Sequence, residues 1–253
     1  MQEQKKSLLI WLNIVAFIST LIVDALAEGT TIIGGKTTAQ VSTQYASFLT
    51  PPGYIFAILG VTYALLGVFI VFQVLPAYRK RKFHKDISYL FIFSSVLNMA
   101  WLFLWQNSFI ALSIIPMLLL LISSGTIYFR LSRDISRTRL TEWLSVKVPF
   151  TIYFGWISVV TLANIAAVFV SFGLNGFGVF AEALIIVATL ILFTFTLFLM
   201  LKKSEVVYAL VILLALTGVA FNTEQNYTVM VSASLVSIMI VASIAIIEVK
   251  DAL

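Results

Sequence analysis

The stretch TPPGYIFAILGVTYALLGVFIVFQVLPA, residues 50–77, places two prolines and a glycine directly before a long apolar run. Proline has no amide hydrogen and a fixed φ, so it suits the first turn of a helix and not its interior. The stretch therefore predicts a loop that ends at Pro51 and a helix that begins near Pro52. About 20 apolar residues in a helix are enough to cross a bilayer, so the run indicates a membrane-spanning segment.

The rest of the chain repeats this apolar pattern. Of its 253 residues 61% are hydrophobic and 11% are charged, and the mean hydropathy is +1.06, whereas about a quarter of the residues in soluble domains are charged. Runs long enough to span a bilayer lie at 8–27, 52–77, 87–106, 108–130, 147–170, 178–201, 205–221 and 227–248. The sequence therefore predicts an all-α integral membrane protein with eight transmembrane helices.

The basic residues indicate the orientation of these spans. Every lysine and arginine except Lys36 lies near a chain terminus or in every second loop between spans. With eight spans, these cations all fall on one side of the membrane, and Lys36 falls on the other. The positive-inside rule then predicts a multi-pass protein of the cell membrane with cytoplasmic N- and C-termini. We interpret the net charge of +5 in the same way, as a signal beside anionic lipid. Nucleic-acid binding is not expected, since the cations lie in short segments between apolar runs.

Several kinds of chemistry are excluded by composition. The chain has no cysteine, which excludes disulfides, thiolate metal sites and thiol catalysis. The single histidine, His84, lies in the basic run YRKRKFHK and is expected to be a solvated loop residue. General acid–base catalysis therefore has few candidates, and we assign neither a catalytic residue nor a metal site.

The third span, within LFIFSSVLNMAWLFLWQN (90–107), carries Asn98, Trp101 and Trp105 on one helical face, at positions i, i+3 and i+7. An amide in hydrocarbon needs a hydrogen-bond partner. Asn98 is therefore predicted either to link two helices or to line a pocket. Trp105 lies near the end of the span, where tryptophan often sits at the membrane interface, whereas Trp101 lies deeper.

Two other spans carry comparable residues. On the second span, Gly60, Tyr63 and Gly67 share one face, which permits close approach of another helix or of a flat ligand. On the fifth span, Trp156 and Asn164 again combine an aromatic side chain with an amide. Helix packing and ligand binding both remain open for these residues.

In this order, the motifs PPGYIF…YALLG, LNMAWLF and PFTIYFGW…LAN resemble those of the TspO/translocator-protein family, the tryptophan-rich sensory proteins (TspO/MBR). The resemblance covers residues 8–171 and is closest to a longer bacterial branch of the family. It implies a TspO-like five-helix bundle over residues 1–171. The three apolar runs that follow lie outside the resemblance and predict an additional three-helix membrane segment at 172–253. The chain departs from the family pattern in having Tyr54 after the prolines and WLF at 101–103.

The resemblance also implies an apolar pocket that binds tetrapyrroles or other flat hydrophobic molecules, closed by the loop at 28–50. The alternative for this loop is an unstructured extracellular segment. The implied ligand-binding residues are Pro51, Pro52, Tyr54, Tyr63, Asn98, Trp101, Trp105, Phe109, Trp156 and Asn164. A tetrapyrrole would be held by stacking and apolar burial, not by axial ligands. Light-dependent porphyrin breakdown follows from family analogy alone.

Acidic residues within spans are costly and therefore informative. Asp24 lies near the outer end of the first span and Glu182 near the outer end of the sixth. Either both are interfacial, or they face a cavity and bind a cation or a proton. The second reading supports an alternative function, an ion-coupled secondary transporter of a small molecule. The expected partners are the lipid bilayer and a hydrophobic small molecule, and a homodimer is left open.

Overall fold

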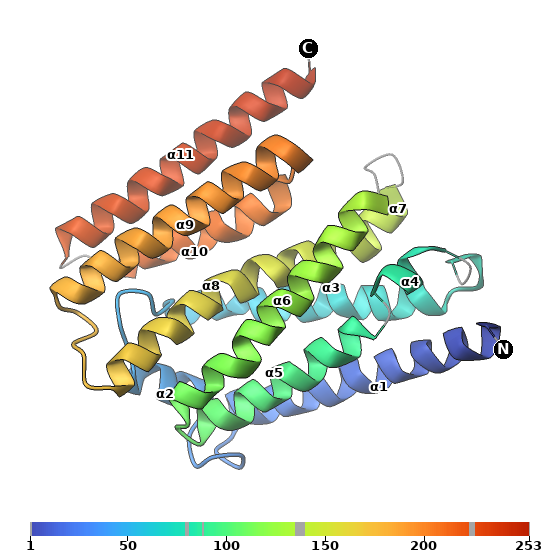
Figure 1. Ribbon diagram of the computed structural model, residues 1–253, viewed down its shortest axis with the longest axis horizontal. Helices are drawn as coiled ribbons and strands as arrows, with labels where there is room; N and C mark the ends of the chain where they lie inside the picture. Colours follow the sequence, from blue (N-terminus) through green and yellow to red (C-terminus); the bar gives the residue numbers. More distant parts are fainter. Residues whose placement is uncertain (1, 79–80, 88, 135–139, 223–225, 253) are drawn as a thin grey trace. The chain divides into compact units, whose positions relative to one another are not determined.

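The computed structural model describes residues 2–78, 81–87, 89–134, 140–222 and 226–252. In this part of the chain every regular element is a helix and no strand is present, which confirms the all-α prediction (Figure 1). The α-helices are α1 (Gln2–Gly29), α2 (Thr38–Gln44), α3 (Ala57–Val74), α4 (Phe83–Ile87), α5 (Leu90–Gln106), α6 (Ile110–Asp134), α7 (Leu140–Glu142), α8 (Val148–Ser171), α9 (Val179–Lys203), α10 (Val206–Asn222) and α11 (Tyr227–Ala252). Short helical segments are η1 (Gly53–Phe56), η2 (Pro76–Tyr78) and the π-helix η3 (Trp143–Lys147).

Among the described residues, 6 helical segments are long and apolar enough to cross a membrane. They are Ser7–Gly29, Gly53–Val74, Ile110–Arg133, Leu140–Ser171, Val179–Lys203 and Thr228–Ala245. Helices α5 and α10 are apolar but shorter. The presence of several spans is thus confirmed, whereas the count of eight stays a prediction. The two terminal residues, Met1 and Leu253, lie outside the described residues, and the cytoplasmic placement of both ends also stays a prediction.

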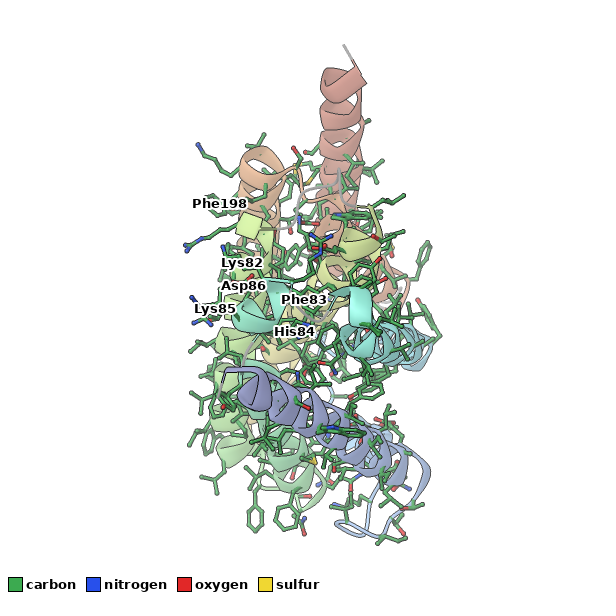
Figure 2. All side chains as sticks on the ribbon, turned by 90° about the vertical axis from the view of Figure 1, so that its right-hand side faces the viewer. Lys82, Phe83, His84, Lys85, Asp86 and Phe198 are labelled. Carbon is green, nitrogen blue, oxygen red and sulfur yellow. The ribbon has the colours of Figure 1, made fainter. Side chains whose placement is uncertain are left out.

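Helix α4 corrects the expectation for the basic run around His84. The run does not form a solvated loop throughout, because part of it folds into α4 and packs against α6. His84 is 6% exposed, its ring lies 4.2 Å from that of Phe83, and its Nε2 lies 3.2 Å from the carbonyl oxygen of Tyr78. Lys82, directly before α4, and Lys85, within it, are exposed (Figure 2). Phe83, His84, Asp86 and Ile87 are buried, so this short helix contributes most of its side chains to the interior.

The chain forms two compact units, which we describe separately. Unit 1 comprises Met1–Val41 and Leu59–Ile157, and unit 2 comprises Ser42–Ile58 and Ser158–Leu253. The units interleave along the chain, and their boundary falls within α8. They therefore do not test the expected division into residues 1–171 and 172–253, which stays a prediction.

Unit 1 has an aromatic core between three helices. In it α5 packs against both α1 and α6. Phe69 of α3, Phe91 of α5 and Phe150 of α8 meet edge to face, with ring centroids 5.0–5.8 Å apart. Asn13 Nδ2 of α1 donates a hydrogen bond to Gln73 Oε1 of α3 at 3.1 Å. These contacts fix which faces of the four helices point inward.

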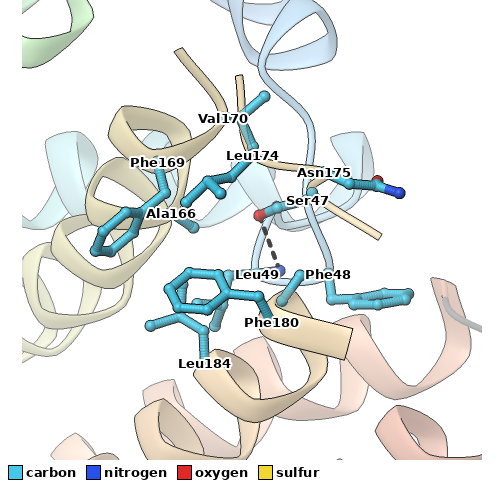
Figure 3. Close-up of a pocket in the computed structure, with 12 residues that line it drawn as sticks. Ser47, Phe48, Leu49, Ala166, Phe169, Val170, Leu174, Asn175, Phe180 and Leu184 are labelled. Carbon is cyan, nitrogen blue, oxygen red and sulfur yellow. Dashed lines mark hydrogen bonds between the residues drawn. The ribbon is translucent and has the colours of Figure 1, made fainter. Parts of the chain in front are cut away.

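Unit 2 combines α9, α10 and α11, which pack against one another, with the chain segment 42–58. The Phe48 amide donates a hydrogen bond to the Gly176 carbonyl oxygen at 3.2 Å, and the Phe48 ring meets Phe177 edge to face at 5.2 Å. Beside this contact lies a small cavity with room for about one water molecule (Figure 3). The segment before η1 is therefore part of the packed core of unit 2.

Candidate functional site

A hydrogen bond between α1 and α5 lies at the centre of the candidate site. Asn98 Nδ2 donates to Asp24 Oδ1 at 3.1 Å, and Asn98 is 6% exposed. The buried amide therefore has the partner that it needs in an apolar environment. The interhelical link, one of the two alternatives for Asn98, is present, while its role in lining a ligand pocket stays a prediction.

Two tyrosines converge on the same carboxyl group. Tyr63 of α3 interacts with both Asp24 and Asn98, and Tyr153 of α8 lies close enough to Asp24 to interact with it electrostatically. We call these four residues the Asp24 cluster. Asp24 Oδ2 is buried and has no hydrogen-bond partner among the described residues. The cluster therefore contains a free acceptor in the middle of four helices.

A small cavity adjoins the Asp24 cluster. It is lined by Phe17, Thr20, Tyr63, Leu66, Phe91, Ser94, Ser95 and Tyr153, and it has room for about one water molecule. Tyr63 and Tyr153 belong to both the cavity and the cluster, and Thr20 lies one helical turn before Asp24 on the same face of α1. Five of the eight lining residues carry a hydroxyl group, so the cavity brings polar groups into an apolar core.

Two tryptophans of α5 stack beside this region. The rings of Trp101 and Trp105 have centroids 5.5 Å apart and an interplanar angle of 28°, and their side chains are 9% and 6% exposed. Trp105 Nε1 donates to the Thr38 carbonyl oxygen at 3.4 Å, whereas Trp101 Nε1 is buried without a partner among the described residues. Trp105 is thus packed beneath α2 and does not face lipid. Trp101 offers an unused hydrogen-bond donor.

The loop at 28–50 contains α2, and its first half is packed against the end of α5. Asn107 Nδ2 lies 3.5 Å from the Ile33 carbonyl oxygen. Gly34 approaches the Gln106 backbone so closely that a Cβ atom there would collide with it. This half of the loop is therefore folded, which favours a lid over an unstructured segment. Its closing of a ligand pocket stays a prediction.

The other predicted ligand-binding residues have different surroundings. In unit 1, Phe109 is 52% exposed at the start of α6, outside the Asp24 cluster, whereas Trp156 is 2% exposed. In unit 2, Tyr54 is 61% exposed and Asn164 is 1% exposed. Pro51 and Pro52 are buried in the segment that enters η1. Their roles in ligand binding stay predictions.

Glu182, the second acidic candidate, belongs to unit 2. Asn226 Nδ2 donates to Glu182 Oε1 at 2.8 Å, and Asn226 Oδ1 accepts the Val229 amide hydrogen at 3.0 Å. Asn226 thus caps the start of α11, while Glu182 lies in the first turn of α9, where the helix dipole favours a carboxylate. These contacts give Glu182 a structural role, and its role in ion coupling stays a prediction.

The sequence interpretation missed the hydroxyl groups around Asp24. Ser94 lies four residues before Asn98, as Thr20 does before Asp24, so helical periodicity places each on the face of its partner. That signal was available in the sequence. Tyr153 had no such signal, because its position depends on how α8 packs. Among the described residues, no group of three or more acidic, histidine or cysteine side chains could hold a metal ion.

Comparison with known proteins supplies a family. A family model described as TSPO-like protein matches residues 10–247. The match extends past residue 171 and takes in α9, α10 and most of α11. No curated protein and no solved structure shows a significant match. Together with the long apolar helices, the family match makes this chain a multi-pass membrane protein.

Proposed function

Because the chain belongs to the family of TSPO-like proteins, we propose that it is a membrane receptor or sensor that binds a flat hydrophobic ligand, such as a tetrapyrrole, along α5. The observation that carries this proposal is the buried, stacked pair of Trp101 and Trp105 with Asn98 on the same helix. Indole rings offer large flat faces for stacking. The plasma membrane is the proposed location, with both chain termini in the cytoplasm.

The unpaired indole N–H of Trp101 supports a ligand with a polar edge. A buried donor without a partner costs about 1–3 kcal/mol, so a ligand oxygen that accepts from Trp101 Nε1 would recover part of that free energy. The single histidine, His84, lies on α4 and not on α5. We therefore expect binding by stacking and hydrogen bonding, with no difference between a metal-free porphyrin and its zinc complex.

Size places a condition on this proposal. Pockets for drug-sized ligands usually have volumes of roughly 300–1,000 Å³, whereas the cavity beside the Asp24 cluster has room for about one water molecule. A tetrapyrrole does not fit this cavity as it stands. Binding in unit 1 therefore requires helices α1, α3 and α5 to separate, and we expect slow association that accelerates steeply with temperature.

A titration of purified protein with protoporphyrin IX tests the proposal. Replacing Trp101 by leucine keeps part of the apolar burial but removes the stack, so we expect a loss of about 1–2 kcal/mol, or about 5- to 30-fold in affinity. Trp156, 2% exposed, should behave similarly. Trp11, which is 64% exposed, is the matched control, and Trp11→Leu should bind normally. Equal, small effects in all three folded variants would rule out a tryptophan-lined site.

A second candidate function is ion-coupled transport of a small molecule. It is supported by the buried carboxylate oxygen of Asp24, because acidic groups within spans often belong to ion pathways. Uptake of the same porphyrin into proteoliposomes separates the two proposals. Accumulation that requires a proton or sodium gradient and is lost in Asp24→Asn would favour transport. Gradient-independent binding would favour the receptor.

A further inference from the structure

We propose that Asp24 binds a small monovalent cation, a proton or a sodium ion, within unit 1. The Asp24 carboxyl meets neighbours from three other helices and has one oxygen without a partner. Two of these neighbours, Tyr63 and Tyr153, also line a small cavity in which five of the eight residues carry a hydroxyl group. This site is distinct from the stacked tryptophans and does not depend on the identity of any larger ligand.

The groups that face Asp24 leave its charge uncompensated. They are Glu28 on α1 itself, Tyr63 on α3, Asn98 on α5 and Tyr153 on α8. None of these side chains is a cation, and Asp24 forms no ion pair among the described residues. An isolated carboxylate within a membrane span is costly. Neutralisation by a cation from solution therefore supplies the charge that the protein itself lacks.

The size and lining of the cavity limit which cation fits. Room for about one water molecule excludes an organic ammonium ion or a fully hydrated metal ion. Hard cations take oxygen ligands, and the cavity offers the hydroxyl groups of Thr20, Ser94 and Ser95 beside the two tyrosines. A proton on Asp24 Oδ2 needs no further space. A bare sodium ion would use the hydroxyl oxygens.

Binding of a cation at Asp24 should change the environment of Trp101 on α5. The Asn98 amide holds the other carboxyl oxygen of Asp24 at 3.1 Å. Trp101 follows Asn98 by three residues and therefore lies on the same face of the helix. Neutralising Asp24 weakens the electrostatic part of this hydrogen bond, because a charged acceptor binds a donor more strongly than a neutral one. Trp101 is thus a natural reporter of the site.

Carbodiimide labelling of the unmutated protein tests the proposal. Dicyclohexylcarbodiimide reacts with a protonated carboxyl group: the carboxyl proton moves to a reagent nitrogen, and the carboxyl oxygen bonds to the central carbon. The product then rearranges to a stable N-acylurea, with no leaving group and no oxidant. Mass spectrometry of peptides locates the adduct. An ionised or sodium-bound carboxylate is not labelled.

In sodium-free buffer we expect labelling of Asp24 that falls about tenfold per pH unit above its midpoint. If sodium is the natural cation, replacing choline chloride by sodium chloride at constant pH protects Asp24. If the cation is the proton alone, this exchange changes nothing. Glu28, exposed one turn further along α1, shows that the reagent reaches this part of the helix. The proposal would be overturned if Glu28 were labelled and Asp24 were not labelled at any pH. It would also be overturned if the labelling of Asp24 depended on neither pH nor sodium.

A variant gives an independent readout. Asp24→Asn keeps a carbonyl oxygen that can accept from Asn98 but can neither be protonated nor bind sodium by charge. We expect the tryptophan fluorescence of the wild-type protein to respond to pH or sodium, and this response to be lost in Asp24→Asn. Glu182→Gln in unit 2 removes the other acidic candidate, so a response that survives in this variant but is lost in Asp24→Asn belongs to Asp24. An identical response in wild type and Asp24→Asn would count against the site.

Discussion

Gly176 lies where the segment before η1 meets the connection between α8 and α9, and Gly176→Ala tests how that segment is held. A Cβ atom at Gly176 would collide with the Ala46 carbonyl oxygen and lie 3.1 Å from Ser47 Cα. Both neighbours are backbone atoms, so no side-chain rotation relieves the clash. The segment around Phe48 must therefore move away from the connection, and we expect this local displacement while the helices of unit 2 remain folded.

The structure gives the size of the effect. The displacement breaks the hydrogen bond from the Phe48 amide to the Gly176 carbonyl oxygen, which is worth about 0.5–1.5 kcal/mol. It also separates the Phe48 and Phe177 rings, whose edge contact is worth about 0.5–1.5 kcal/mol. Together we expect local opening to become easier by about 1–3 kcal/mol. That corresponds to roughly a 5- to 160-fold larger open population.

Chymotrypsin cleavage after Phe48 measures this population. Phe48 is 7% exposed and therefore protected in the packed form. When opening and closing are fast, the cleavage rate follows the equilibrium fraction of the open form. Gly178→Ala is the matched control, because a Cβ there meets Asn175 atoms at 3.4–3.5 Å, an ordinary contact distance. Equal cleavage rates at Phe48 in wild type and Gly176→Ala would refute the reasoning. Equally fast cleavage in both variants would mean that the connection is merely fragile.

Three further outcomes are expected. In Gly34→Ala the new Cβ would collide with the Gln106 backbone, so the free energy of local opening in the first half of the loop should fall by about 1–3 kcal/mol. Faster amide hydrogen exchange in this half would show the change, and unchanged exchange would contradict it. Arg81→Gln removes a 3.1 Å ion pair with Glu142, and because Arg81 is 47% exposed we expect a loss below about 1 kcal/mol that shrinks with salt in thermal unfolding. A reporter fused after Leu253 should lie in the cytoplasm, and an external reporter would reject the predicted topology.

The helices of this chain follow from local properties. Long, mostly apolar runs form α3, α6, α8, α9, α10 and α11 close to their predicted bounds, because hydrophobicity and helix propensity are summed over near neighbours. Helix α6 continues through Pro116, and the charged residues of α9 lie near its ends. Pro51 and Pro52 likewise predicted where the loop ends, although a short 3-10 helix precedes α3. The span expected at 87–106 is shorter, since α5 begins at Leu90 after the separate helix α4.

The candidate site was partly readable from periodicity. Asn98, Trp101 and Trp105 were predicted to share one face, and all three are buried, with the two indoles stacked. That much depends on the 3.6-residue repeat within a single helix. The same reasoning could name Asp24 as unusual but could not choose between an interfacial residue and a buried one, because the choice depends on what another helix places beside it.

By itself, then, the sequence determined the membrane class, most helices and the face of α5 that carries its polar and aromatic residues. Tertiary structure decided the pairings: Asp24 with Asn98, 74 residues apart, and Phe48 with Gly176, across about half of the chain. The physical reason is that hydropathy and propensity are local sums. A contact between distant residues depends on the rotation of each helix and on the volumes packed between them, which local patterns do not contain.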